Sequence, residues 1–88
     1  MADFFDRLVA VCAPEIAAAV KTNDADRAAA MIEGLATMLG RTIARAAGGD
    51  AREIEKILMG CEQHIAAEAA GVAGLINLQE TLRARRGG

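Results

Sequence analysis

The sequence predicts an all-α protein built from three helices. Alanine fills 21 of the 88 positions, whereas serine, tryptophan and tyrosine are absent. Alanine has the highest helix propensity and lets helix axes approach closely. Between the alanines, Leu, Ile, Val and Met recur every three or four residues, which is the spacing of one helix face. We therefore expect a kinked N-terminal helix packed on a long antiparallel αα-hairpin, completed as a dimeric helical bundle.

Size and composition predict a single helical domain over residues 1–88 with a thin core. Hydrophobic residues make up 53% of the chain and charged residues 25%, as is usual for globular proteins. Only Phe4 and Phe5 are aromatic, so the core must be built from aliphatic, Met and Ala side chains. A domain of this length buries little surface, and a homo-oligomer, with a dimer favoured, would complete the core.

The first helix is expected over residues 3–21. Asp3 and Asp6 suit a helix N-terminus, where a carboxylate meets the positive end of the helix dipole. Pro14 removes a backbone donor in mid-helix, which predicts a kink near residues 10–13, with two short helices as the alternative. The expected apolar face consists of Phe5, Leu8, Cys12, Ile16 and Val20.

The second helix is expected over residues 24–47, after the capping cluster Thr22-Asn23-Asp24. A row of small residues, Ala36, Gly40 and Ala44, would let another helix backbone pack closely. The expected apolar seam consists of Ala28, Met31, Ile32, Leu35, Met38, Leu39, Thr42, Ile43 and Ala46.

The third helix is expected over residues 50–83, followed by a basic tail at 83–88. Gly48-Gly49 ends the preceding helix, and Asp50 and Glu53 form a candidate capping box. So short a turn predicts that the second and third helices form the antiparallel hairpin. Gly71 and Gly74 leave open a fourth short C-terminal helix. The expected apolar stripe consists of Ile54, Ile57, Leu58, Cys61, Ile65, Val72, Leu75, Ile76 and Leu82.

The residue inventory argues against an enzyme. The chain has no serine, one histidine and no glycine-rich phosphate loop, so we predict no catalytic residues and no cofactor. The helical pattern favours a non-enzymatic interaction protein, namely an adaptor, assembly factor or regulator with a protein partner of unknown identity. A phage or mobile-element accessory protein belongs to the same class.

Two other functions are carried as alternatives. Cys61, His64 and Glu68 fall on one side of a helix and are weak candidates for a metal or redox site, since thiolate, imidazole and carboxylate all bind zinc. The segment Arg83–Arg86 is the densest cationic cluster and could contact nucleic acid in a small regulator. A nucleic-acid partner is nevertheless disfavoured, because the formal net charge is −2.

Cysteine usage and hydropathy predict a cytoplasmic protein without a membrane contact. Cys12 and Cys61 show no disulfide framework, which favours reduced thiols. The N-terminus is acidic and lacks the cationic start of a secretory signal. The longest weakly charged stretch, residues 69–79, is shorter than the roughly 20 residues that span a bilayer.

Overall fold

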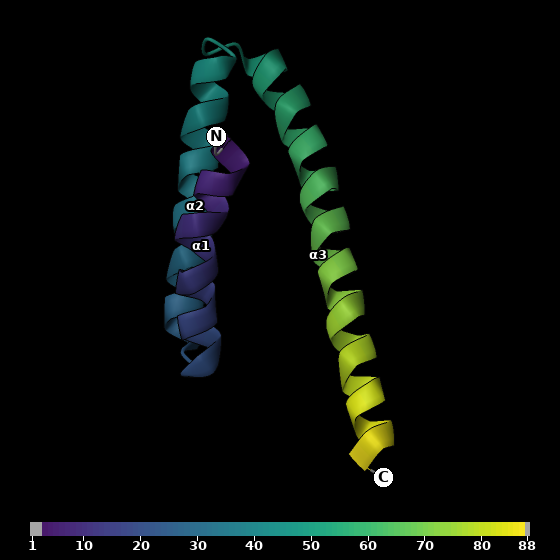
Figure 1. The fold of residues 1–88 in the computed structure, drawn as a ribbon. Coiled ribbons are helices and arrows are strands. Elements are labelled where there is room, and N and C mark those ends of the chain that lie inside the picture. The colour runs from purple at the N-terminus through teal and green to yellow at the C-terminus, as the bar shows by residue number, and fades with distance from the viewer. Residues whose placement is uncertain (1–2, 88) are drawn as a thin grey trace. The chain divides into compact units, whose positions relative to one another are not determined.

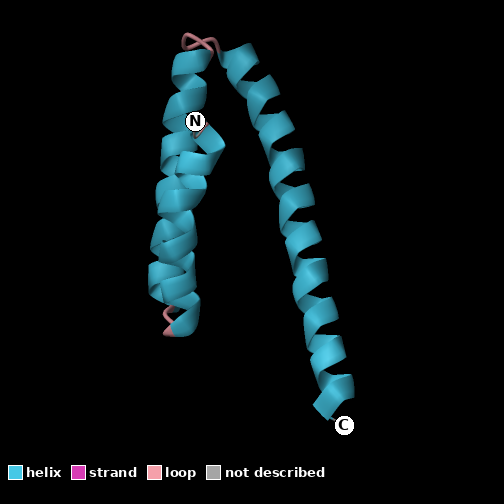
Figure 2. Cartoon of the chain, viewed as in Figure 1, coloured by secondary structure: helices cyan, strands magenta, loops and turns pink. Residues whose placement is uncertain are grey.

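The computed structural model describes residues 3–87, which form three helices with no strand among them (Figures 1 and 2). These are α1, Phe4–Lys21, α2, Ala25–Ala46, and α3, Ala51–Gly87. The predicted all-α class is therefore confirmed. The chain divides into two compact units, one ending at Thr42 and the other beginning at Ile43. We call them the N-terminal and C-terminal units and describe each by itself.

Helix α1 begins with a reciprocal capping box. The backbone amide of Asp6 donates to Asp3 Oδ1 at 2.8 Å, and the amide of Asp3 donates to Asp6 Oδ2 at 3.3 Å. The two carboxylates thus satisfy amides that the first turn leaves unpaired. The helix continues without interruption across Pro14, so the alternative of two short helices is wrong. The kink itself stays a prediction.

A tight turn at 22–24 reverses the chain between α1 and α2 (Figure 1). The hydroxyl of Thr22 donates to the Ala18 carbonyl at 2.8 Å, and the amide of Asp24 donates to the Ala19 carbonyl at 2.8 Å. Asn23 adopts the left-handed conformation, with φ at 52°. Asp24 Oδ1 then accepts from the Arg27 amide at 2.9 Å, which caps α2 as the sequence predicts.

The buried contact of the N-terminal unit lies next to this turn. Ala19 is buried, and five further side chains are half-buried: Cys12, Glu15, Ala18, Ala28 and Met31. The expected face of α1 is only partly correct, because Val20 is 72% exposed and Phe5 68% exposed. A methyl group fits where the chain reverses tightly, and this explains why Ala19 rather than Val20 lies inside.

The C-terminal unit begins with the last residues of α2 and a glycine turn. Ile43 is its buried residue, and Gly48 and Gly49 have φ values of 60° and 78°. Asp50 Oδ1 accepts from the amides of Arg52 at 2.9 Å and Glu53 at 3.1 Å. Of the expected capping box, only the contacts of the Asp50 side chain form. The Glu53 carboxylate pairs with Lys56 at 3.4 Å instead of accepting from the Asp50 amide.

Helix α3 is continuous over 37 residues, so a separate fourth helix is not formed within residues 3–87. It passes through Gly71 and Gly74 and includes Arg83–Arg86, which the sequence analysis assigns to a tail. Such a helix is about 55 Å long at 1.5 Å per residue. None of its described residues is buried, and Ile54, Ile57 and Cys61 are half-buried. The antiparallel hairpin of α2 and α3, the single domain and the dimeric bundle stay predictions.

Candidate functional site

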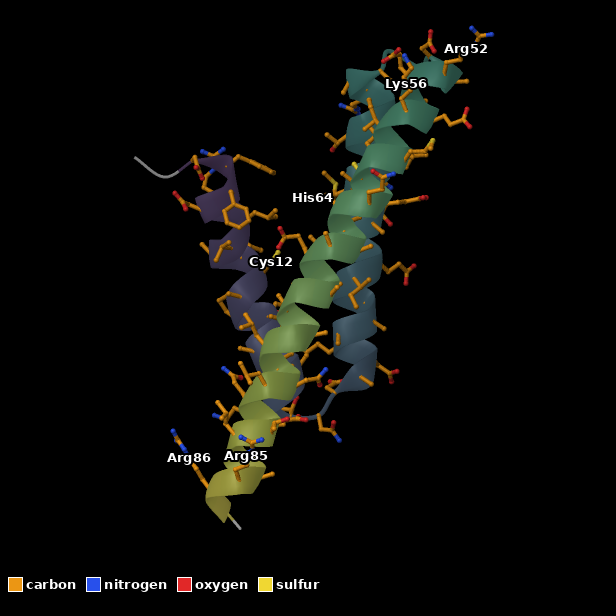
Figure 3. All side chains as sticks on the ribbon, turned by 90° about the vertical axis from the view of Figure 1, so that its right-hand side faces the viewer. Cys12, Arg52, Lys56, His64, Arg85 and Arg86 are labelled. Carbon is orange, nitrogen blue, oxygen red and sulfur yellow. The ribbon has the colours of Figure 1, made fainter. Side chains whose placement is uncertain are left out.

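The candidate metal-binding residues lie along one side of the first half of α3. His64 lies on this part of α3 (Figure 3). Its Nε2 stands 3.9 Å from Glu68 Oε1, and the two side chains are 77% and 72% exposed. Cys61 is a half-buried free thiol one turn earlier. Within residues 3–87, no three His, Cys, Asp or Glu side chains gather in a way that would hold a metal ion. The pair forms a water-exposed contact that depends on His64 being protonated.

The basic cluster occupies the last turns of α3. Arg85 and Arg86 project from the end of α3 (Figure 3), and Arg83 precedes them on the same helix, which continues to Gly87. Their charges complement the negative end of the helix dipole. Gln79, Leu82, Arg83 and Arg86 border a shallow surface hollow on this same helix. One side of a single helix cannot enclose a small ligand, so the hollow offers a surface rather than a pocket.

The dominant surface feature is apolar. Among the described residues, 19 large hydrophobic side chains are exposed, while only Ala19 and Ile43 are buried. Scattered exposed apolar residues are normal in soluble proteins, but contiguous ones mark interaction surfaces. Helix α3 carries eight of these side chains: Leu58, Met59, Ile65, Val72, Leu75, Ile76, Leu78 and Leu82. This is the largest number of exposed large apolar side chains on any one of the three described helices.

The small-residue row on α2 is open. A Cβ added to Gly40 would meet no atom within 4 Å, and the same holds at Gly34. Within the N-terminal unit, no backbone therefore packs against Gly40. The close helix approach that the small residues would permit is not used by α1 at Gly40.

One contact that sequence reasoning missed fastens α1 to α2. Arg27 Nε donates to Glu15 Oε1 at 2.7 Å, and Arg27 Nη2 donates to Glu15 Oε2 at 3.1 Å. The hydrogen bond and the charge of Arg27 lower the pKa of Glu15 below its ordinary value. The two residues are 12 positions apart in the sequence. Their opposite charges, on either side of a predicted capping turn, were the sequence feature that could have indicated the contact.

Comparison of the chain with protein-family models, with curated proteins and with solved structures gives no match. Function must therefore be argued from the residues themselves. Among the described helices, none combines the length and the apolar character needed to cross a lipid bilayer.

Proposed function

We propose that the protein is a non-enzymatic interaction protein, acting as an adaptor, assembly factor or regulator through helix-to-helix contacts, and that it associates with itself through α3. The observation that carries the proposal is the exposed apolar surface of α3, where eight large side chains lie in water and no described residue is buried. A helix of this length gains most of its stability from packing an apolar face, and here that face is unpaired.

Helix lengths favour a second chain as the cover. Helix α3 has 37 residues, α2 has 22 and α1 has 18. At 1.5 Å per residue these helices measure about 55, 33 and 27 Å. In any packing of α3 along the other two helices of its own chain, about 20 Å of α3 extends past the longer one. This extending part of α3 therefore needs a surface that the chain itself does not supply.

The free energy available from burial is comparable with the cost of association. A fully covered aliphatic side chain contributes about 1.5–3 kcal/mol, and side chains already half-covered contribute roughly half of that. Six such side chains from each of two copies would contribute on the order of 12 kcal/mol. The loss of translational and rotational freedom costs about 4–15 kcal/mol, so a stable or dynamic dimer is within reach.

Analytical ultracentrifugation of the full chain tests this proposal. We expect a dimer that dissociates on dilution, and Leu75→Glu should shift it to monomer by placing a charge in the covered surface. Leu75 is 62% exposed, so this change leaves the fold of the separate chain intact.

The matched control is Val11→Glu, which places the same charge at a 73% exposed apolar position on α1. The control should sediment like the wild type. A wild-type protein that stays monomeric at millimolar concentration, or a Val11→Glu variant that dissociates as fully as Leu75→Glu, would contradict self-association through α3.

A further inference from the structure

The apolar side chains of α3 follow a seven-residue repeat. Positions spaced alternately four and three residues apart lie on one side of the helix, and we call this set the seam. Its members are Cys61, Ile65, Glu68, Val72, Leu75, Gln79 and Leu82. Five of these are apolar, and the repeat averages 3.5 residues, which is the period of a seam between two supercoiled helices. The large apolar members are exposed in the separate chain. The seam therefore has the form of a two-helix contact.

The two polar members of the seam determine the direction of the partner helix. A parallel, in-register pair would set Glu68 against Glu68 of the partner subunit, and two carboxylates in one layer repel each other. An antiparallel pair, related by a two-fold axis between Ala73 and Gly74, places Glu68 opposite Gln79 of the partner subunit. The Gln79 amide can then donate to the carboxylate, so both polar groups are satisfied.

The same antiparallel alignment brings apolar residues together. In the seam, Val72 meets Leu75 of the partner subunit and Ile65 meets Leu82 of the partner subunit. Beside the seam, small residues face large ones: Gly71 lies by Leu78 of the partner subunit, and Ala69 by Ile76 of the partner subunit. No atom of the described chain lies within 4 Å of a Cβ added to Gly71, so the space is open for that side chain. The two-fold axis repeats each of these pairs.

Charge complementarity supports the same direction. Within the paired segment, residues 61–73 carry Glu62 and Glu68 and no lysine or arginine, whereas residues 74–86 carry one acid, Glu80, and three cations, Arg83, Arg85 and Arg86. The antiparallel alignment places Glu62 beside Arg83 of the partner subunit, at positions that flank the seam and form ion pairs in coiled coils. A parallel pair would instead gather six arginines at one end.

We infer that α3 pairs with α3 of a second copy in antiparallel orientation over residues 61–86, with Glu68 and Gln79 fixing the register. This inference rests on the self-association proposed above and adds the direction and alignment of the partner.

A charge exchange across the proposed pair tests the alignment. Glu62→Arg should weaken dimerisation about tenfold, because it faces Arg83 of the partner subunit twice per dimer. The double variant Glu62→Arg with Arg83→Glu should regain most of the wild-type affinity. Glu55→Arg makes the same charge change one repeat earlier, outside the paired segment, and should leave the affinity unchanged. A double variant that dimerises no more tightly than Glu62→Arg alone would overturn the alignment.

Cysteine cross-linking tests the direction of the two paired α3 helices separately from whether the chains associate. In a background with Cys12→Ala and Cys61→Ala, the variant Ile65→Cys with Leu82→Cys keeps Glu68 and Gln79 and should give a covalent dimer joined between 65 and 82 with a short bismaleimide. Leu82→Cys alone should give none, because its two copies would lie about 25 Å apart along the axis. An 82-to-82 link in a sedimenting dimer would overturn the antiparallel direction and leave the proposed function standing. A monomer by sedimentation would overturn both.

Discussion

At the scale of single residues, the backbone conformation at the two turns is the strongest constraint. Gly48 and Gly49 have positive φ values, which L residues with a Cβ adopt only at a cost of about 1–2 kcal/mol. Asn23 occupies the same region at the first turn, where its short polar side chain is among the best tolerated after glycine. Glycines inside the helices are under the opposite constraint, because helical φ values suit alanine better.

Replacing glycine by alanine should therefore have opposite effects at the turn and in the helix. Gly48→Ala should lower the free energy of unfolding by about 1–2 kcal/mol through backbone strain. Gly40→Ala, in open space on α2, should raise it by about 0.5–1 kcal/mol. Urea denaturation followed by circular dichroism measures both. A destabilised Gly40→Ala protein would contradict this reading and indicate that another backbone packs on the small-residue row.

At the scale of helices, local chemistry made the boundaries predictable. Asp3, Asp24 and Asp50 cap the helices that the sequence assigns to them, because a cap needs only the side chain and the next few amides. The predicted contact of Glu53 with the start of α3 is wrong. The Glu53 carboxylate pairs instead with Lys56, which lies one turn later on the same helix.

Contacts between helices were less predictable. The position of Ala19 inside the N-terminal unit depends on where the turn places α2 against α1, which periodicity does not specify. The Glu15–Arg27 pair depends on the same geometry. Among the candidate metal residues, His64 and Glu68 approach each other as helical spacing requires, and no third ligand joins them within the described helices. The apolar stripe of α3 was predicted as a sequence pattern, while its exposure was visible only in three dimensions.

The Glu15–Arg27 pair should give the α1–α2 contact a pH dependence. The pKa of Glu15 is lowered in the folded protein, so the pair stabilises the fold above the ordinary carboxylate pKa and loses this effect as pH falls through the lowered value. Glu15→Gln should therefore lower Tm by about 1–4 °C at neutral pH, since both side chains are partly exposed. The difference should shrink in acid.

Thermal melts of the wild type and Glu15→Gln between pH 7 and strongly acidic pH measure this effect. Glu33→Gln removes an exposed carboxylate from α2 and serves as the control. A Tm difference for Glu15→Gln that is independent of pH would show that the ion pair contributes nothing to stability.

At the scale of the whole molecule, folding and association should be coupled. Two residues of the described chain are buried, and under the proposed self-association the remaining apolar burial would come from partner contacts. Mass action then makes Tm depend on protein concentration. We expect Tm to rise by a few degrees for each tenfold increase in concentration, and Leu75→Glu to abolish this dependence. A wild-type Tm that does not change with concentration would contradict the coupling.

The unbroken length of α3 gives the proposed pairing a further property. With the two-fold axis between Ala73 and Gly74, the two copies of Ala51 would lie about 70 Å apart, at opposite ends of the paired helices. Each end continues into its own α2 and α1. An unbroken pair of helices would therefore hold the two glycine turns that precede α3 at a fixed separation.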